Sequence, residues 1–161
     1  VMVGNRVADV LIGQGGEFNH GYTYSGHPVA CAVALANLEL MERENLPGRV
    51  KNDTGPYLAE RFEELKHHPL VGDAETCGFV AGLVLVKNKA TGEMFDPDLA
   101  VGMVCRRHCF GNGLIMRAVG DRMIIAPPLT MTRAQIDELM DLIHRCLDAT
   151  LDELRSQGLR G

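Results

Sequence analysis

The clearest periodic pattern of apolar positions lies close to the C-terminus. Thr132 and Gln135 have the spacing of a capping box, in which each side chain satisfies a backbone N–H of the other residue at the start of a helix. One apolar face then repeats at helical spacing through Ile136, Leu139, Met140, Ile143, Leu147, Thr150 and Leu154. The pattern predicts a long amphipathic helix that runs until Gly158 and packs on a hydrophobic core.

Between residue 46 and this helix, the pattern alternates between helical and strand-like segments. Leu58, Phe62 and Leu65 form a narrow apolar stripe among charged residues, which is typical of an amphipathic surface helix. The expected elements are a helix at residues 48–68, a central strand at 77–86, a helix from Asp96-Pro97 to about Phe110, and two short strands at 114–117 and 122–125 around a turn at 118–121. This order predicts an α+β domain with its helices on one face of a small sheet.

Residues 1–45 show a different pattern. Residues 28–44 are apolar on nearly every side as far as Leu38, and such a helix must be covered on every side by other parts of a protein. Residues 1–3 resemble the end of a buried strand, and residues 5–12 a short helix. Because the chain opens on apolar residues, we expect it to be part of a larger protein. The expected domains are the end of one domain at residues 1–45 and a C-terminal domain at residues 46–161.

A loop at residues 19–28 leads into the apolar helix and is the first candidate for chemistry. It holds two of the three tyrosines of the chain, together with Thr23 and Ser25. Pro28 suits the first turn of a helix, where its missing N–H costs nothing. The free N–H groups of that turn and the helix dipole favour an anion beside the loop. The alternative is that Thr23 and Ser25 only cap the helix.

Composition narrows the class of protein. The chain is 46% hydrophobic and 23% charged, as a globular domain is, and its net charge of −5 argues against nucleic acid or an anionic membrane as a partner. No apolar run approaches the roughly 18 residues that span a bilayer. The odd number of cysteines, 5, predicts free thiols in a cytoplasmic protein. Cys105, His108 and Cys109 share one helix, but no second pair stands at ligand spacing, so we expect no metal site.

Arg117 is the second candidate. It ends the expected strand at 114–117 beside a Gly-Asp turn, where its guanidinium fork has the geometry to receive a carboxylate with two hydrogen bonds. The alternative is a structural ion pair with Asp121 or a solvated arginine in the turn. Arg122 has the same alternative and ranks lower because it begins its strand.

Both regions resemble class III aminotransferases, and most closely the branch that acts on ω-amino acids and pyruvate. Residues 18–29 read Phe-Asn-His-Gly-Tyr-Thr-Tyr-Ser-Gly-His-Pro-Val, and residues 34–39 read Ala-Leu-Ala-Asn-Leu-Glu. Residues 114–121 read Leu-Ile-Met-Arg-Ala-Val-Gly-Asp, and residues 126–132 read Ala-Pro-Pro-Leu-Thr-Met-Thr. The resemblance covers the whole chain in order.

The resemblance implies an α/β enzyme of fold type I that depends on pyridoxal phosphate and works as a homodimer or a dimer of dimers. The chain would hold the end of its large domain and its small C-terminal α+β domain. Thr23 aligns with the threonine that binds the cofactor phosphate of the neighbouring subunit, and Tyr22 with the residue beside it. Arg117 aligns with the arginine that receives the α-carboxylate of the amino or keto acid. The implied reaction moves an amino group from an amine or ω-amino acid to a keto acid such as pyruvate.

One part of the family pattern is missing from the chain. The family needs a Schiff-base lysine upstream of the cross-subunit threonine, and the lysines here are Lys51, Lys66, Lys87 and Lys89. None matches the motif, and Lys87, at the end of an apolar strand, is the least implausible nucleophile. We therefore expect no catalytic residue in this chain and no transamination by it alone. The alternatives are a non-catalytic binding or dimerisation module that keeps the C-terminal domain, or another activity of the family such as an aminomutase or decarboxylase.

Overall fold

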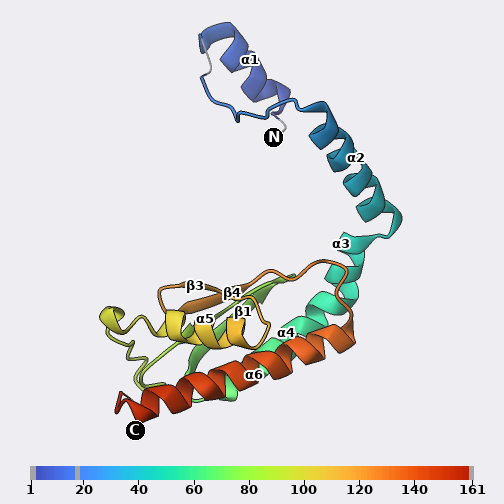
Figure 1. Cartoon of the computed structure of the whole chain (residues 1–161). Helices are drawn as coiled ribbons and strands as arrows, with labels where there is room; N and C mark the ends of the chain where they lie inside the picture. Colours follow the sequence, from blue (N-terminus) through green and yellow to red (C-terminus); the bar gives the residue numbers. More distant parts are fainter. Residues whose placement is uncertain (1–2, 17–18, 160–161) are drawn as a thin grey trace. The chain divides into compact units, whose positions relative to one another are not determined.

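The computed structural model describes residues 3–16 and 19–159 of the chain. These residues form two compact units, Val1–Leu40 and Met41–Gly161. Each unit is described by itself, with the elements labelled in Figure 1. The domain boundary expected at residues 45 and 46 concerns a longer protein and stays a prediction. Residues 1 and 2 of the expected N-terminal strand lie outside the described residues.

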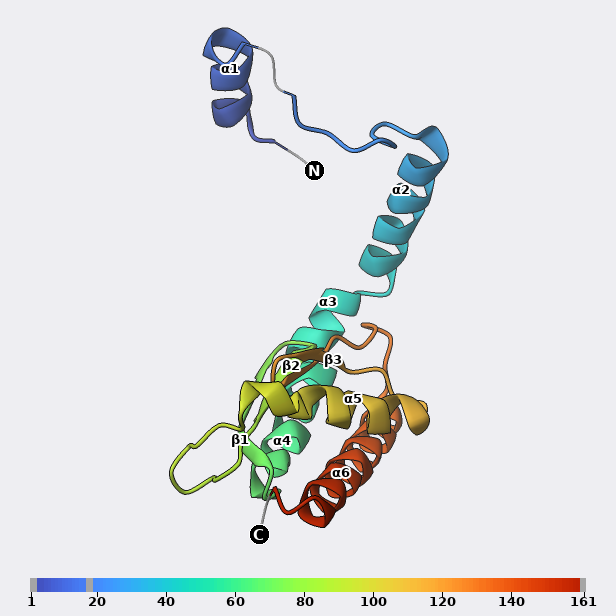
Figure 2. The ribbon, with the colours of Figure 1, turned by 60° about the vertical axis from the view of Figure 1, so that its left-hand side comes forward.

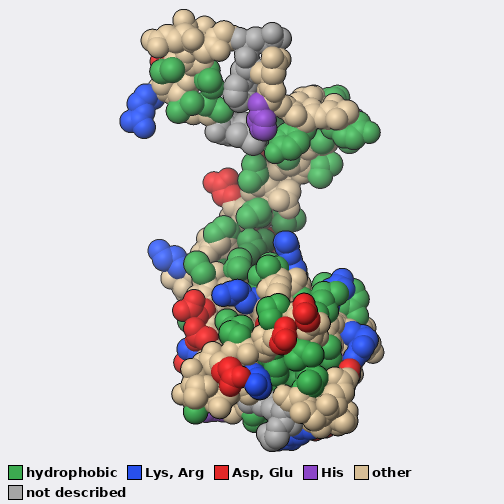
Figure 3. Space-filling model, turned by 90° about the vertical axis from the view of Figure 1, so that its left-hand side faces the viewer, with side chains coloured by type: hydrophobic (Ala, Val, Ile, Leu, Met, Phe, Trp, Pro, Cys, Tyr) green, Lys and Arg blue, Asp and Glu red, His purple; other side chains and the backbone are tan. Residues whose placement is uncertain are grey.

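The first unit contains α1 (Asn5–Gln14) and most of α2 (Pro28–Arg43). Both helices were expected from the hydrophobic pattern, and α1 is slightly longer than predicted. No residue of α2 is buried by the described part of the chain. Val33 and Leu35 are 64% and 62% exposed, and hydrophobic side chains are visible over the surface of this unit in Figure 3. A partner that covered α2 would therefore gain about 25 cal/mol for each Å² of apolar surface that it removed from water.

The second unit is a four-stranded antiparallel sheet in the order β1-β2-β4-β3, packed against helices. The strands are β1 (Val71–Cys77), β2 (Val80–Leu85), β3 (Arg117–Val119) and β4 (Arg122–Ile125). The helices are α3 (Leu46–Arg49), α4 (Gly55–Glu63), α5 (Val101–Gly111) and α6 (Arg133–Ser156). Figure 2 shows α4, α5 and α6 together beside the sheet. The predicted α+β arrangement is confirmed.

The helices cover only one face of the sheet. Along β2 the burial alternates, so that Ala81, Leu83 and Leu85 are buried, whereas Val80 on the opposite face is 54% exposed. We call the face that carries Val80 the open face. The prediction that β2 is a central strand is confirmed, because it lies between β1 and β4. Its apolar residues on the open face remain uncovered in this unit.

Helix α6 has the start and the buried face that the sequence predicted. Thr132 and Gln135 form both hydrogen bonds of the capping box. The predicted apolar face is buried throughout, at Ile136, Leu139, Met140, Ile143, Leu147, Thr150 and Leu154. The helix packs on α4 and α5, so it closes the core on the side away from the open face.

The helix predicted at residues 48–68 is interrupted. It begins as α3 at Leu46, widens into a π-helical turn (Val50–Thr54), continues as α4 and ends in a 3₁₀ turn (Glu64–His67). The N–H of Gly55 donates to the carbonyl of Val50, five residues back. Pro56 has no N–H to donate to the preceding turn, and a wider turn accommodates that missing bond. The helix after Asp96-Pro97 is also split, into a 3₁₀ turn (Pro97–Leu99) and α5.

Two hairpins correct the strand predictions. The sequence did not predict β1, and the turn between β1 and β2 is Gly78-Phe79 rather than part of a strand. The second turn is Gly120-Asp121, so β3 begins at Arg117 instead of ending there. Gly78 and Gly120 have φ values of 58° and 56°. Two-residue hairpin turns need a positive φ at this first position, which glycine adopts without strain.

Candidate functional site

The first part of the candidate site is an exposed turn just before α2. The N–H of Tyr22 donates to Ser25 Oγ (3.0 Å), and the N–H of Ser25 donates back to the carbonyl of Tyr22 (3.0 Å). Gly26 follows with a φ of 74° and directs the chain into the helix. The two bonds close the turn around Thr23, whose side chain lies at its tip and is exposed.

His27, and neither Thr23 nor Ser25, caps α2. The Nδ1 atom of His27 accepts a hydrogen bond from the N–H of Ala30 (3.3 Å), which is the usual bond of an N-cap side chain. The expected alternative, that Thr23 and Ser25 serve as caps, is therefore wrong for the described contacts. Ser25 holds the turn, and the hydroxyl of Thr23 makes no hydrogen bond with a residue that the structure describes.

This turn fits a phosphate group. Residues 19–38 contain no carboxylate, so nothing in this stretch repels an anion. The Thr23 hydroxyl makes no hydrogen bond with a described residue, and Thr23 lies five positions before the start of α2, where the helix dipole favours negative charge. Tyr22 is 74% exposed beside it. Residues 19–28 contain no lysine or arginine, so the Thr23 hydroxyl is the donor that this turn offers to a phosphate.

The second part of the candidate site is Arg117, which lies on the open face of the sheet. In the ladder Arg117 stands opposite Ile124, Ile124 opposite Gly82, and Gly82 opposite Glu75. These residues therefore form one row across the open face, with opposite charges at its two ends. Beside the row is a shallow pocket of about 360 Å³, lined in part by Glu75, Gly82 and Ile124. Sequence reasoning missed Glu75 because it missed β1.

No described carboxylate makes an ion pair with Arg117, whose side chain is exposed. The alternative that Arg117 is paired with Asp121 is not what the structure shows. The carboxylate of Asp121 instead accepts a hydrogen bond from the backbone N–H of Gly102 (2.9 Å) at the start of α5. The guanidinium of Arg117 thus keeps its donors for a ligand.

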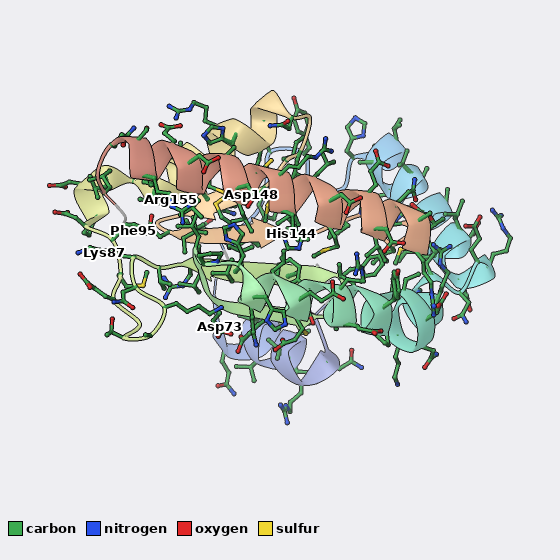
Figure 4. The ribbon with its side chains drawn as sticks, turned by 90° about the horizontal axis from the view of Figure 1, so that it is seen from below. Asp73, Lys87, Phe95, His144, Asp148 and Arg155 are labelled. Carbon is green, nitrogen blue, oxygen red and sulfur yellow. The ribbon has the colours of Figure 1, made fainter. Side chains whose placement is uncertain are left out.

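None of the four lysines has the environment of a catalytic nucleophile. Lys87 lies after β2 at the margin of the unit, where its ammonium pairs with Glu93 at 2.6 Å and its side chain is 48% exposed (Figure 4). A hydrogen bond to Glu63 raises the pKa of Lys66, which opposes the deprotonation that a nucleophilic lysine needs. Lys51 and Lys89 are exposed. The expectation that the Schiff-base lysine lies outside this chain stays a prediction.

The cysteine-rich helix α5 is used for packing. Cys105 and Cys109 are buried beside Cys146 of α6, whereas His108 Nε2 contacts Glu153 Oε2 at 2.8 Å. The hydrogen bond to Cys105, and then burial, raise the pKa of Cys109, so its thiol stays protonated. Within the described residues no group of three or more potential ligands is arranged to hold a metal ion. No described helix combines the length and hydrophobicity needed to cross a membrane.

Comparison with known proteins places these features in a family. Residues 1–147 match the class-III aminotransferases. The chain belongs to this family. It is 58% identical over 150 residues to the putrescine–pyruvate aminotransferase of Pseudomonas aeruginosa, which covers 93% of the chain and 32% of that protein. It is 40% identical over 164 residues to the diaminobutyrate–2-oxoglutarate transaminase of Halomonas elongata, with 98% of the chain and 35% of that protein covered.

Solved structures of the same family confirm the fold. A thermostable (S)-enantioselective ω-transaminase from Thermomicrobium roseum is 36% identical with a TM-score of 0.82, over 92% of this chain and 33% of that one. A PLP-bound aminotransferase mutant from Vibrio fluvialis is 34% identical with a TM-score of 0.80, over 92% and 32%. The chain is thus a portion of a fold-type-I enzyme fold and spans about a third of the length of its relatives.

The structure brings some of the predicted residues together and leaves others in separate units. Tyr22 and Thr23 share one turn in the first unit, and Arg117 stands on the sheet of the second. Sequence reasoning missed two contributors to local order. His27 could have been found as the residue before the helix-starting Pro28. The bond between Asp121 and Gly102 has no local signal, because the two residues lie 19 positions apart.

Proposed function

We propose that this chain is the C-terminal part of a pyridoxal-phosphate-dependent aminotransferase that moves an amino group from an amine or ω-amino acid to a keto acid such as pyruvate. The observation that carries the proposal is membership of the class-III family, with 58% identity to a putrescine–pyruvate aminotransferase. When bound, the cofactor supplies an electrophilic carbonyl and an electron-accepting ring that carry the amino group between two substrates. The residues of this chain bind and orient, and they do not perform the covalent chemistry.

Thr23 and Tyr22 form the cofactor-binding part of the proposal. The Thr23 hydroxyl donates to the phosphate, and the exposed ring of Tyr22 lines the entrance beside it. We propose that this phosphate belongs to the cofactor of a second subunit, so the active enzyme is a homodimer with a shared site. Two observations support an external ligand: the Thr23 hydroxyl has no described partner, and Tyr22 is 74% exposed.

Arg117 forms the substrate-binding part of the proposal. Its guanidinium binds the α-carboxylate of an amino or keto acid with two parallel hydrogen bonds, which also fix the orientation of the carbonyl or amino group to be exchanged. The absence of an ion pair with a described carboxylate leaves it available for this role, because a buried or paired arginine would first have to be released. A substrate without a carboxylate does not use this contact.

The proposal is tested with Arg117→Ala in the full-length protein. We expect the KM for pyruvate to rise roughly 10- to 100-fold, since hydrogen bonds to charged groups contribute about 1.5–3 kcal/mol. The KM for an amine without a carboxylate should change little. Arg117→Lys keeps the charge but not the fork, and it should fall between the two. Arg122→Ala, an exposed arginine on the same face, is the matched control. An equal rise in the KM for both substrates would contradict this role of Arg117.

Two further tests concern the rest of the proposal. A visible absorption spectrum with added pyridoxal phosphate should show a bound-cofactor band for the full-length protein and none for residues 1–161 alone. If the natural polypeptide has no upstream region with a cofactor lysine, the non-catalytic module replaces the enzyme as the best account. We also propose a cytoplasmic location, which agrees with five free cysteines.

A further inference from the structure

The strand that carries Arg117 has little support of its own. β3 contains three residues and lies at the edge of the sheet, so it has β4 on one side and none of the described strands on the other. Arg117 is the residue of β3 furthest from the turn, opposite Ile124. β4 is itself paired with β2, whereas the ladder of β3 is formed with β4 alone among the described strands. The position of Arg117 therefore depends on what holds the turn at Gly120-Asp121.

That turn is held by the start of α5. The residue before α5 is Ala100, which has a left-handed backbone (φ 46°) and a side chain without a hydrogen-bonding atom. Ala100 cannot cap the helix, although the first N–H groups of any helix need partners. Asp121 provides the missing cap from another element, because its Oδ1 accepts from the N–H of Gly102 at 2.9 Å. A carboxylate at a helix N-terminus is also stabilised by the helix dipole.

Close packing reinforces this bond. A Cβ atom at Gly102 would lie 2.0 Å from the carbonyl oxygen of Gly120 and 3.2 Å from the Cα of Asp121. The helix backbone thus rests directly on the backbone of the turn, an approach that only glycine permits. The carbonyl of Asp121 also accepts from the N–H of Leu85 (2.8 Å), the last residue of β2. Asp121 therefore joins the hairpin to α5 and to β2.

We infer that Asp121 is a positioning residue for Arg117: through its bond to Gly102 it fixes the β3–β4 hairpin on α5, and it thereby sets where the guanidinium meets the substrate carboxylate. This inference rests on the proposed role of Arg117 in carboxylate binding. Asp121 itself does not touch the substrate. Its carboxylate accepts from the N–H of Gly102 and makes no ion pair with Arg117 among the described residues.

The test measures substrate discrimination in the full-length protein with Asp121→Ala and Asp121→Asn. Asp121→Ala should raise the KM for pyruvate about tenfold, within the roughly 100-fold limit expected when a binding group is misplaced by about 1 Å. The KM for an amine without a carboxylate should stay within about twofold, and kcat should change less than the KM for pyruvate. Asp121→Asn keeps an oxygen that accepts from Gly102, so it should restore most of the pyruvate KM.

Asp96→Ala is the matched control, because it removes the same kind of bond without touching the hairpin. The carboxylate of Asp96 accepts from the N–H of Asp98 (3.0 Å) in the 3₁₀ turn just before α5. It should leave the pyruvate KM unchanged. An increase as large as that of Asp121→Ala, or an equal rise for both substrates with Asp121→Ala, would overturn the positioning role.

Hydrogen–deuterium exchange gives a readout that does not depend on activity. In Asp121→Ala, residues 101–103 and 117–125 should exchange faster than in the wild type, and in Asp96→Ala residues 117–125 should not. Unchanged exchange over 117–125 in Asp121→Ala would contradict the inference. If Asp121→Ala does not fold, Asp121→Ser is used for the same measurements, because serine is itself a common turn residue but lacks the carboxylate.

The inference and the proposed function fail in different ways. If Arg117→Ala does not change the pyruvate KM selectively, the role of Arg117 is wrong, whatever Asp121 does. If Arg117→Ala is selective and Asp121→Ala is not, Arg117 binds the carboxylate without the help of Asp121. The exchange data then show whether the β3–β4 hairpin stays in place when the bond from Asp121 to α5 is removed.

Discussion

The guanidinium of Arg49 binds the backbone carbonyl of Met131 and that of the residue before it. Arg49 Nη2 donates to the carbonyl oxygen of Met131 at 2.6 Å and to that of Thr130 at 2.8 Å. Arg49 belongs to α3 and is half-buried, whereas Thr130 and Met131 connect β4 to the capping box of α6. The side chain thus links the first helix of the second unit to the start of its last helix.

Arg49→Ala should destabilise the second unit by about 1.5–3 kcal/mol, the usual contribution of hydrogen bonds to a charged group. Arg49→Lys should recover only part of this stability, because an ammonium cannot serve two carbonyls in the fixed geometry of a guanidinium. Urea unfolding of the full-length protein measures both. Since the acceptors are carbonyls and not carboxylates, the loss should depend little on salt. A loss that disappears at 1 M salt would point instead to an ion pair.

Two glycines of α5 should respond in opposite ways to alanine. At Gly102 the new Cβ would meet the carbonyl of Gly120 at 2.0 Å, so the helix or the hairpin must move. Such overpacking costs about 1–3 kcal/mol or more. At Gly111, the last residue of the same helix, a Cβ meets nothing within 4 Å. Gly111→Ala should therefore be neutral or stabilising by up to about 1 kcal/mol.

Thermal unfolding of the two alanine variants distinguishes these cases in one experiment. A melting temperature for Gly102→Ala equal to that of the wild type would show that the hairpin does not rest on α5 as tightly as the structure has it. The comparison is internal to one helix, so differences in helix propensity between the two substitutions largely cancel.

The parts of the fold that the sequence predicted well are those fixed by local residues. The capping box at Thr132 and the apolar stripe after it define α6, because both signals lie within the helix itself. The strand β1 gave no such signal. Gly72, Asp73 and Glu75 are poor strand formers, and this segment is a strand because it pairs with β2 along one edge of the sheet.

At the candidate site, the position of Arg117 could likewise not be predicted from local residues alone. Residues 114–117 are mostly apolar and suggest a strand, but Leu114 and Met116 are buried in the core without belonging to the ladder. The pairing starts at Arg117 because the two-residue turn at Gly120 sets the register. For Thr23, the residues alone predicted an anion beside the loop or a helix cap, and the proposed contact with a cofactor phosphate came from the family resemblance.

The stability of the α5–α6 contact should depend on the charge of Glu153. Its carboxylate accepts from Arg107 (2.6 Å) and contacts His108 Nε2 (2.8 Å), and these contacts, Arg107 first, lower its pKa. A carboxyl with a lowered pKa in the folded state stabilises the fold above its ordinary pKa of about 4.3, and this contribution disappears as the pH falls through the lower, folded value.

Glu153→Gln should therefore lower the melting temperature at pH 7, and the difference from the wild type should shrink as the pH falls below about 4. Arg107 is exposed and Glu153 is half-buried, so salt also screens part of the effect. Glu138→Gln, an exposed glutamate on the same helix, is the control and should change little at either pH. A difference that grows on acidification would contradict the lowered pKa of Glu153.

Thr23 should control how tightly the full-length protein retains pyridoxal phosphate. Removing one hydroxyl that donates to a charged phosphate should weaken binding by roughly 10- to 100-fold in Thr23→Ala, since such a bond contributes about 1.5–3 kcal/mol. Thr23→Ser keeps the donor and should bind nearly as the wild type does. Thr91→Ala is the matched control, because Thr91 accepts from the N–H of Glu93 in an exposed turn of the second unit.

The binding is measured by titrating the cofactor-free protein with pyridoxal phosphate, followed by absorbance, and by competition with inorganic phosphate. In the wild type, phosphate should compete with the cofactor, because both would accept from the Thr23 hydroxyl at the tip of the turn at Tyr22–Ser25. In Thr23→Ala the competition should weaken in parallel with cofactor binding. Weaker cofactor binding with unchanged phosphate competition would mean that Thr23 acts on another part of the cofactor, and an unchanged affinity would remove it from the site.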